Sequence, residues 1–546
     1  MTIRLPAVPA SRQELERHGQ RWLDRFIDGY LAAAAAQAPD APAVIDGPHC
    51  LSYGEAARRT AATAASLQDL GVQPGDVVSW QLPNWHEAYL LHQAVLRIGA
   101  VSNPIVPIYR QRELSYILSE AGSRVFVVPE SFRGFSYAAM AAGLRPALPA
   151  LEHVIVCRPA GHGEPADFAR LSAGSRQPRP VTRSPDDPVL LMFTSGTTAQ
   201  PKGVIHTHNT LDYENRSIID VFGLTAADVV FMPSPVSHIT GLLYGLQLPA
   251  MLGTAVVFQD VWEPGAALRL IQRHGCAFTV AATPFLHGLT YHPDLPPGGL
   301  PTLRAFACGG ADVPPGLVYA ARKRLGSVVT RVYGSTEFPT LSACGPDQPA
   351  EKAATTDGRP IGAAQCRVTD PDTGTVLRAG QVGELVVTGP ELFLGYLRPQ
   401  DGAGCFTPDG WFRTGDLAAC DPDGYVTIRG RKKDIILRGG ENISVAEVED
   451  LLFEHPLVAE VAIVAMPDPV MVERACAFVV PAEGTAPTLE DLAGYLIARQ
   501  LARQKIPERL ELVTELPKTQ SGKVQKFRLR QLVADLLAAE QARCAG

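Results

Sequence analysis

The sequence predicts an α/β protein with a large N-terminal part, a β-rich segment and a small C-terminal domain. Helical and strand patterns alternate over residues 1 to about 185 and resume over residues 255–334. Short strands separated by turn residues fill residues 362–431, and a compact mixed pattern follows. Strands that alternate with helices form βαβ units, so we expect parallel sheets in the N-terminal part.

The individual elements follow from apolar periodicity and β-branched runs. In the first region we expect helices at 56–70 and 86–100 and strands at 76–80 and 124–129. In the second region we expect a helix at 267–276 and strands at 255–258, 277–284, 304–311 and 328–334. Turns centred on Thr373-Gly374, Asp409-Gly410 and Asp423-Gly424 then predict hairpins or a small barrel. Near the C-terminus we expect a helix at 446–454 and strands at 458–466 and 475–481.

The chain length and these changes of pattern indicate two domains. With 546 residues the chain is too long for one hydrophobic core. We place the boundary at about Lys432, which gives an N-terminal domain of residues 1–431 and a C-terminal domain of residues 432–546.

Composition narrows the class of protein. The chain is 46% hydrophobic and 19% charged, and its net charge of -7 argues against a nucleic-acid-binding surface. The ten cysteines show no CxxC pair, which indicates reduced thiols. The N-terminus has no secretory signal, and the apolar run from Leu242 is interrupted by Gln247 and Pro249, so it reads as buried core. We therefore expect a cytoplasmic enzyme.

The first segment whose side chains suggest a binding site is TSGTTAQPKG, residues 194–203. Its backbone N–H groups, its hydroxyls and Lys202 are groups that bind phosphate oxygens. It lacks the G-x-x-x-x-G-K-[ST] spacing of a Walker loop. Taken alone, it fits a polar surface loop equally well.

Four further segments follow it in order along the chain. They are YGSTE (333–337), GWFRTGDL (410–417), GRKKDIILRGGENIS (430–444) and PKTQSGKVQK (517–526). With all five motifs the chain resembles the adenylate-forming superfamily, which contains acyl-CoA synthetases, luciferases and the adenylation domains of peptide synthetases. The resemblance runs from about Ala43 to Lys526, and RGGENIS, VAEVE and PKTQSGKVQK are most similar to acyl-CoA synthetases of aliphatic or alicyclic acids.

The resemblance implies a fold and a reaction. The fold is a large N-terminal domain of stacked α/β subdomains with a small β-barrel-like subdomain, followed by a small mobile α+β C-terminal domain. In the reaction a carboxylate attacks the α-phosphate of ATP to give acyl-AMP and pyrophosphate, and the thiol of coenzyme A then displaces AMP. ATP, coenzyme A and Mg²⁺ are the implied partners. Hydroxyls, lysines and a metal-binding carboxylate suit such phosphoryl chemistry.

The resemblance also implies a role for each residue of the ATP site. Glu337 would hold Mg²⁺, and Thr336 would reach the α-phosphate. The β- and γ-phosphates would be bound by Thr194, Ser195, Gly196, Thr197, Thr198 and Lys202. The other nucleotide contacts would come from Gly309, Gly310, Ala311, Tyr333, Gly334, Ser335, Asp416, Ile428 and Arg431. Taken singly, Asp416 also fits an Asx-turn and Tyr333 also fits a core position.

Lys523 and the hinge carry the implied catalytic cycle. A lysine in a Ser-Gly-Lys loop is ordinarily solvated. The resemblance implies instead that Lys523 neutralises charge as the carboxylate attacks ATP. Lys433 matches the hinge of the family, and rotation there would exchange Lys523 for the loop of the CoA-binding residues Gly439, Gly440 and Glu441.

The acid pocket is expected next to PSPVSHITG, residues 233–241. His238 would gate the carboxylate, although a buried core histidine fits the same position. The pocket walls would be Val236, Thr240, Gly241, Phe285 and Cys308, with Gly334. Small and apolar walls indicate a bulky or cyclic apolar acid as the substrate.

Three other functions fit parts of the sequence. They are a stand-alone adenylation protein that loads a carrier protein, a luciferase-type oxygenase and a nucleotide-binding regulator. Ala199 raises a further alternative, because relatives carry glycine there. If the loop takes an ordinary conformation there, Ala199 is harmless. If the loop needs positive φ, alanine costs about 1–2 kcal/mol and the chain would be a ligase with impaired adenylation that acts on supplied acyl-AMP. A homodimer is left open.

Overall fold

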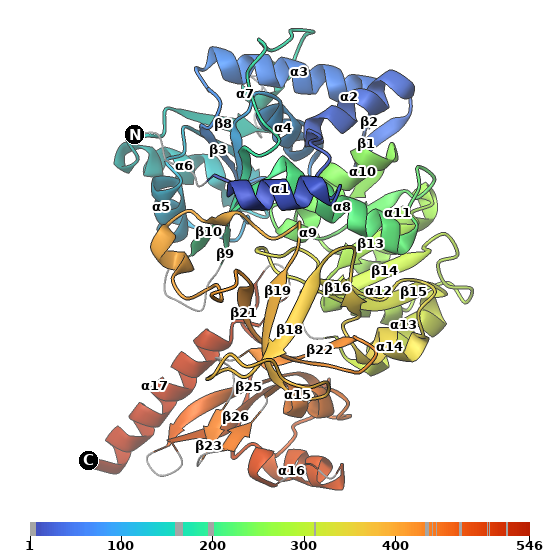
Figure 1. Cartoon of the computed structure of the whole chain (residues 1–546). Helices are drawn as coiled ribbons and strands as arrows, with labels where there is room; N and C mark the ends of the chain where they lie inside the picture. The colour runs from blue at the N-terminus through green and yellow to red at the C-terminus, as the bar shows by residue number, and fades with distance from the viewer. Residues whose placement is uncertain are drawn as a thin grey trace.

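The computed structural model of the chain describes residues 7–158, 167–194, 201–310, 313–431, 436–438, 441–443, 445–468, 472–499, 501, 503–519, 522 and 524–545. Two large α/β regions lie side by side above a curled β-sheet, and a small C-terminal region lies below it in Figure 1. This is the predicted fold class.

The first α/β region is built on a sheet that has seven strands in the described chain, in the order β20-β10-β9-β4-β3-β5-β8. The pairings of β3 with β4 and β5, of β5 with β8 and of β4 with β9 are parallel, as the sequence predicted. The strands are β3 Val77–Trp80, β4 Val101–Pro104, β5 Val125–Pro129, β8 His153–Cys157, β9 Pro188–Thr194, β10 Lys202–Thr207 and β20 Gly395–Tyr396. The helices are α3 Tyr53–Asp69, α4 His86–Arg97, α5 Gln111–Glu120, α6 Tyr137–Leu144 and α7 Asp167–Leu171.

The second region holds a sheet with nine strands in the described residues, ordered β17-β16-β15-β14-β13-β11-β12-β1-β2. Its strands are β1 Pro42–Asp46, β2 His49–Ser52, β11 Val230–Met232, β12 Val256–Phe258, β13 Phe278–Ala281, β14 Ala305–Gly309, β15 Val328–Tyr333, β16 Ser342–Ala343 and β17 Arg359–Pro360. Its helices are α8 His208–Phe222, α9 Ile239–Gly241, the π-helix η2 Leu242–Gln247, α10 Leu248–Leu252, α11 Pro264–His274, α12 Thr283–Tyr291, α13 Pro315–Leu325 and α14 Ala350–Thr355.

One strand crosses between the two regions, which the sequence did not predict. β1 precedes the first sheet in the chain, yet it pairs in parallel with β12 of the second sheet. Local periodicity identifies a strand but carries no information on a partner more than 200 residues away, so this pairing could not be inferred.

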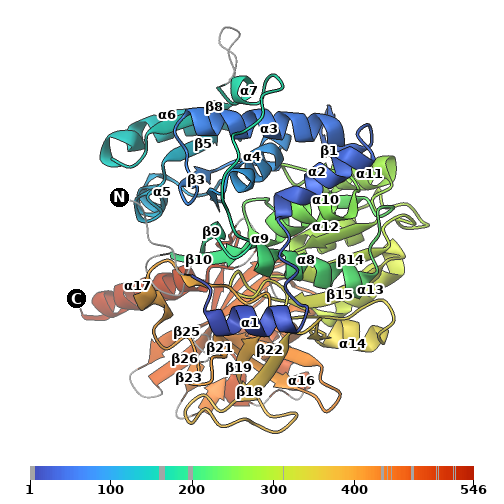
Figure 2. The same ribbon diagram turned by 45° about the horizontal axis from the view of Figure 1, so that its top comes forward.

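Several helices were not predicted from the sequence. α1 Ala10–His18, α2 Ile27–Gln37, α8 and the C-terminal α17 Lys526–Ala545 were not expected. α8 nevertheless has clear end signals, because Thr207 and Thr210 form a capping box and Gly223 ends the helix at φ 56°. α1 lies across the front of the molecule in both views (Figures 1 and 2).

The β-rich segment forms an antiparallel sheet in the order β18-β19-β21-β22. The strands are β18 Gln365–Thr369, β19 Gly383–Thr388, β21 Phe412–Cys420 and β22 Val426–Arg431, with the 3₁₀ turn η3 Pro399–Gly402 before β21. The Sγ atoms of Cys366 and Cys420 are 3.9 Å apart although their strands are not neighbours in the sheet. The sheet is therefore curled, in agreement with the expected barrel-like subdomain.

The C-terminal region mixes helices and strands as predicted. Its strands are β23 Ile436–Arg438, β24 Glu441–Ile443, β25 Val458–Asp468, β26 Val472–Pro481 and β27 Arg509–Leu512. Its other elements are α15 Val445–Phe453, α16 Leu489–Ala498, the 3₁₀ turn η5 Arg503–Lys505 and α17. The small pair β6 Ser131–Phe132 and β7 Phe135–Ser136, and the turn η1 Arg145–Ala147, complete the described elements.

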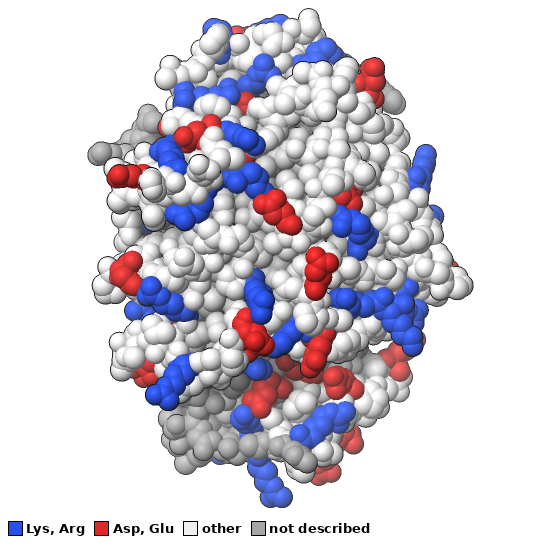
Figure 3. All heavy atoms as spheres, turned by 45° about the vertical axis from the view of Figure 1, so that its right-hand side comes forward, with Lys and Arg blue, Asp and Glu red and all other residues white. Residues whose placement is uncertain are grey.

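The apolar run from Leu242 is buried core, as expected. Leu242, Leu243, Leu246 and Leu248 have no exposed surface. Across the described residues, no helix combines the length and apolar character that crossing a membrane requires. On the face shown in Figure 3 the described basic and acidic side chains are interspersed, without the continuous basic stripe that nucleic-acid binding uses.

Candidate active site

The predicted nucleotide residues gather where two neighbouring parallel strands end. β14 ends at Gly309 and β15 ends at Tyr333, and Gly309 pairs in register with Val332. A Cβ on Gly309 would lie 2.4 Å from the carbonyl oxygen of Val332, so glycine permits this close strand packing. The carboxyl edge of parallel strands is where α/β folds place ligands. Ala311 lies outside the described residues.

A tight loop then presents Thr336 and Glu337. Its start at Gly334 accepts no side chain, because an added Cβ would lie 1.8 Å from the carbonyl oxygen of Pro339. The Ser335 amide donates to the carbonyl of Phe338 at 2.8 Å, and the Phe338 amide donates back to the Ser335 hydroxyl at 3.2 Å. These bonds close the loop and hold Thr336 in a buried position.

His206 supports the same loop from β10. Its Nε2 lies 2.7 Å from the carbonyl oxygen of Thr336, and its Nδ1 lies 3.1 Å from the hydroxyl of Thr210. Burial lowers the pKa of His206 to about 4, so the imidazole is neutral near pH 7. A neutral ring that faces a carbonyl must donate its Nε2–H, which fixes the tautomer.

Glu337 is held at two points. The Phe393 amide donates to the Glu337 carbonyl at 2.8 Å, and the Tyr396 hydroxyl donates to Oε1 of its carboxylate at 2.7 Å. Among the described residues the carboxylate is bonded through Oε1, so Oε2 remains as a hard oxygen ligand. Mg²⁺ commonly takes one protein carboxylate together with substrate phosphates, and this geometry fits that ion.

The predicted phosphate-binding loop, residues 194–203, is linked to Glu337 by Tyr396, because Lys202 of the loop contacts the Tyr396 ring. Lys202 lies over the Tyr396 ring, with Nζ 4.9 Å from the ring centroid, and donates to the carbonyl of Asp401 at 2.9 Å. Thr194 donates through its hydroxyl to the carbonyl of Lys202 at 3.5 Å. Residues 195–200 of the loop, among them Ser195, Gly196, Thr197, Thr198 and Ala199, lie outside the described residues.

The predicted adenine and ribose residues are in direct contact. The Tyr333 hydroxyl donates to Oδ2 of Asp416 at 2.5 Å. The Asp416 amide donates to the hydroxyl of Thr414 at 3.1 Å, so the side-chain acceptor here is Thr414, and Asp416 itself lies within β21. Asp416 also pairs across the strands with Arg431, whose side chain lies outside the description. The Ile428 amide donates to Asp357 at 2.8 Å.

The predicted acid-pocket residues come from three elements. His238 caps α9, and its Nδ1 accepts from the Thr240 amide at 3.5 Å. A Cβ on Gly241 would lie 2.1 Å from the carbonyl oxygen of Pro235, so the chain requires glycine there. The ring of Phe285 meets that of Trp262 edge-on at 4.8 Å. Val236 and Cys308 have no exposed surface, so neither lines an open pocket in this structure, and burial raises the pKa of the Cys308 thiol to about 12.

Gly522 of the C-terminal motif lies against α12 of the large domain. A Cβ built on Gly522 would lie 2.8 Å from Cγ of Pro284, the neighbour of Phe285 in α12. The predicted catalytic Lys523, the hinge Lys433 and the CoA residues Gly439 and Gly440 lie outside the described residues. Glu441 begins β24, and its side chain is not described.

His206 and Tyr396 were not predicted from the sequence. Both lie in strands, but neither belongs to a spacing that points to chemistry. Their roles depend on hydrogen bonds to Thr336 and Glu337, which are 130 and 59 residues away along the chain.

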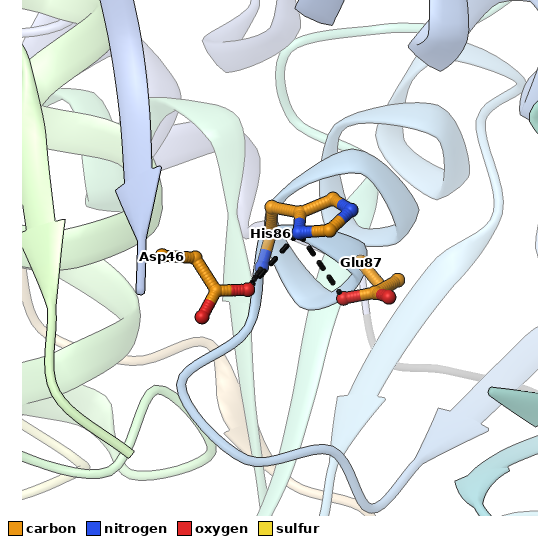
Figure 4. Close-up of side chains that lie close together, drawn as sticks. All are labelled: Asp46, His86 and Glu87. Carbon is orange, nitrogen blue, oxygen red and sulfur yellow. Dashed lines mark hydrogen bonds and ion pairs between the residues drawn. The ribbon is translucent and has the colours of Figure 1, made fainter. Parts of the chain in front are cut away.

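A second cluster of titratable groups lies between β1 and α4. His86 Nδ1 is 3.0 Å from Oδ2 of Asp46 and 3.5 Å from Oε2 of Glu87, and Figure 4 shows the ring reaching both carboxylates. These three groups are close enough to hold a metal ion. However, the Arg158 guanidinium pairs with both carboxylates and lies 4.0 Å from the Trp85 ring centroid. The cluster is therefore a buried ion-pair network that joins the two α/β regions.

Comparison with known proteins agrees with the five motifs. Residues 31–397 match the AMP-binding enzyme family, and residues 447–523 match the AMP-binding enzyme C-terminal domain. The chain is 35% identical over 526 residues to the medium-chain fatty-acid–CoA ligase of Escherichia coli (strain K12), an alignment that covers 95% of this chain and 92% of that protein. It is 34% identical over 531 residues to the salicyl-AMP ligase / salicyl-S-ArCP synthetase of Mycobacterium tuberculosis, with 95% and 92% covered.

Solved structures give the same result. ATP-bound MatB from Rhodopseudomonas palustris matches with a TM-score of 0.85 at 28% identity, over 94% of this chain and 100% of that one. The amide bond synthetase McbA from Marinactinospora thermotolerans matches with a TM-score of 0.81 at 29% identity, over 93% and 99%. Since both family models and the architecture agree, the chain belongs to the AMP-binding enzyme family, in the acyl-CoA synthetase branch of the adenylate-forming superfamily.

Proposed function

We propose that this acyl-CoA synthetase converts an apolar carboxylic acid and ATP to an acyl-AMP, and then forms the CoA thioester with release of AMP. The observation that carries the proposal is the grouping of Thr336, Glu337 and Asp416 at one edge, with Gly522 packed on α12 beside the expected acid pocket. That grouping combines phosphate-binding, ribose-binding and acid-binding candidates around one place.

Each residue of the site would have a separate role in the first step, the formation of acyl-AMP. Mg²⁺ bound by Glu337 would supply positive charge to the phosphate oxygens. The Thr336 hydroxyl would donate to the α-phosphate, and His206 would keep the backbone of Thr336 in place. Asp416 would accept from the ribose hydroxyls. Lys523, which the sequence places next to Gly522, would neutralise charge at the attacked phosphorus.

The class of acid follows from the expected pocket walls. Val236, Gly241, Phe285 and Cys308 are apolar or small residues, and the Cys308 thiol is neutral. Two of the relatives act, by their names, on a medium-chain fatty acid and on salicylate. We infer an apolar aliphatic or aromatic acid without a second charge.

A panel assay tests this function. The purified protein is incubated with ATP, Mg²⁺, CoA and one acid at a time, from linear medium-chain acids to aromatic acids. We expect pyrophosphate release and a thioester mass for one group of apolar acids. The proposal fails if no acid on the panel gives either product while ATP still binds.

Carrier-protein loading is the second candidate, because the M. tuberculosis relative carries a carrier protein in its name. The panel should therefore be repeated with a phosphopantetheinylated carrier protein in place of CoA. A thioester on the carrier alone would favour this second function.

Ala199 allows a variant of the main function. If the phosphate loop needs glycine geometry there, adenylation is weak and the chain uses acyl-AMP made elsewhere. ATP–pyrophosphate exchange of the wild type is compared with that of Ala199→Gly. A large gain in the variant supports impaired adenylation, and equal rates exclude it.

For the location of the protein we propose the cytoplasm, where ATP and CoA are available.

A further inference from the structure

The N-terminal segment of residues 8–27, here called the strap, lies before the start of the family match at residue 31. It contains α1 and is anchored by several contacts. Trp22, which is 3% exposed, donates through Nε1 to the carbonyl of Pro390 at 3.2 Å. The Ile27 amide donates to Nδ1 of His208 at 3.2 Å. The strap is therefore a packed part of the large domain.

Arg12 of the strap binds the loop of residues 389–397. Its guanidinium donates to the carbonyl of Phe393 at 3.1 Å, to that of Pro390 at 3.2 Å and also to that of Leu392. A guanidinium has five N–H donors in a fixed plane, so several carbonyls can converge on it. Burial lowers the pKa of Arg12 to about 10, which still leaves it charged at neutral pH.

The same loop holds Glu337. The Phe393 amide donates to the Glu337 carbonyl, so the residue whose carbonyl binds Arg12 also fixes the backbone of the metal ligand candidate. Further along, the amides of Leu394 and Leu397 donate to the carbonyls of Ile205 and Gly203 in β10 at 2.8 and 2.7 Å. The loop is thereby stretched between the strap and β10.

Tyr396 transmits this arrangement to the carboxylate. Its hydroxyl donates to Glu337 Oε1 at 2.7 Å, and its ring lies beneath Lys202. Burial and the neighbouring Glu337 carboxylate raise the pKa of Tyr396 above its usual range, so the hydroxyl remains a donor. The Tyr396 side chain thus contacts both Glu337 and Lys202, the two residues that we expect to bind the metal and the phosphates.

We propose that Arg12 is a positioning residue of the ATP site: by fixing the loop 389–397 it orients Glu337 and Tyr396 toward nucleotide-bound metal. This inference rests on the proposed function. Arg12 would thus act at the ATP site although it precedes residue 31, where the family match begins.

Direct binding of metal and nucleotide tests the proposal. Mn²⁺ replaces Mg²⁺, and its paramagnetic signal reports the affinity for Mn²⁺ with ATP in the absence of acid and CoA. The variants are Arg12→Met, Arg12→Lys and Tyr396→Phe. The control is Arg21→Met, because the Arg21 guanidinium bonds Glu16 and Leu15 inside the strap.

We expect Arg12→Met and Tyr396→Phe each to weaken metal–nucleotide binding roughly tenfold, since each removes a hydrogen bond that involves a charged group. Arg12→Lys should recover part of the loss, because lysine keeps the charge but not the planar donors. The double variant Arg12→Met/Tyr396→Phe should lose less than the product of the single losses, because both act through Glu337.

Unchanged binding in Arg12→Met, an equal loss in Arg21→Met, or independent losses in the double variant would each overturn the proposal. If Arg12→Met does not fold, Arg12→Lys decides: binding equal to wild type overturns the proposal, and a loss absent from Arg21→Met supports it. Because binding needs neither acid nor CoA, a protein that binds Mn²⁺ with ATP but makes no thioester disproves the proposed function alone.

Discussion

At Gly522 the backbone φ is +83°, and an added Cβ would lie 2.8 Å from Cγ of Pro284. Both facts require glycine, since L-residues disfavour this φ and the proline ring is rigid. The residue therefore controls how closely the loop that carries Lys523 approaches α12. Gly484 offers a comparison, because its φ is +74° and nothing lies within 4 Å of its added Cβ.

We predict that Gly522→Ala lowers the rate of acyl-AMP formation roughly tenfold, from a backbone cost of about 1–2 kcal/mol plus the contact with Pro284. Thioester formation from supplied acyl-AMP should be spared. Gly484→Ala has the same backbone cost without the contact, so it should change stability but not adenylation. Equal adenylation rates in the two variants would contradict the role of the Pro284 contact.

At the scale of elements, the ion pair of Arg331 and Asp357 joins β15 to β22. Both residues are buried, and the Arg331 Nε donates to Asp357 Oδ1 at 3.0 Å. Asp357 also accepts from the Ile428 amide at 2.8 Å. The strand that ends at Tyr333 and the strand that carries Ile428 are therefore tied by one carboxylate.

Asp357→Asn should destabilise the fold by about 3–5 kcal/mol, because the Arg331 charge stays buried without its counter-charge. Chemical denaturation of the wild type and the variant measures the difference. The double variant Arg331→Met/Asp357→Leu removes both charges and should recover part of the loss. A cost below 1 kcal/mol for the single variant, by the same measurement, would show that the pair is dispensable.

Two buried groups of α8 make the stability depend on pH in opposite directions. Burial lowers the pKa of His208 to about 4 and raises the pKa of Glu214 to about 7. The contribution of His208 is present above pH 6.5 and is lost as the pH falls toward 4. That of Glu214 is present below pH 4.5 and is lost as the pH rises through about 7.

We expect His208→Asn to gain melting temperature relative to the wild type as the pH falls from 6.5 to 4, since the variant has no buried group to protonate. Glu214→Gln should gain as the pH rises from 4.5 to 7. Replacement of the exposed His18 by Asn is the control and should follow the wild type throughout. Parallel melting curves for all four proteins would show that neither buried group titrates as stated.

At the scale of the whole molecule, the two half-reactions should separate by domain. Lys523→Ala should slow acyl-AMP formation about 100-fold or more, because one preorganised charge is lost from the transition state. It should leave thioester formation from supplied acyl-AMP intact. Gly439→Leu should show the reverse pattern, with acyl-AMP accumulating because a side chain blocks the pantetheine path. If either variant impairs both half-reactions equally, domain alternation is not the mechanism.

Much of this protein could be predicted from the sequence, because the signals are local. Apolar periodicity identified α3, α4 and the strands β14 and β15, and turn residues identified the curled sheet. The order of the five motifs identified the superfamily, and with it Thr336, Glu337 and Asp416 as candidates. Each of these inferences depends on residues that are close along the chain.

The tertiary structure decided the contacts between distant segments. It alone paired β1 with β12, placed His206 against the Thr336 carbonyl and brought Arg12 to the loop that holds Glu337. Such contacts arise when independently predictable elements pack, and the packing is selected by burial and hydrogen bonding summed over the whole chain. A local sequence pattern carries no information about burial and hydrogen bonding summed over the whole chain. The sequence therefore determined the chemistry of the motifs, and the tertiary structure determined which other residues hold them in place.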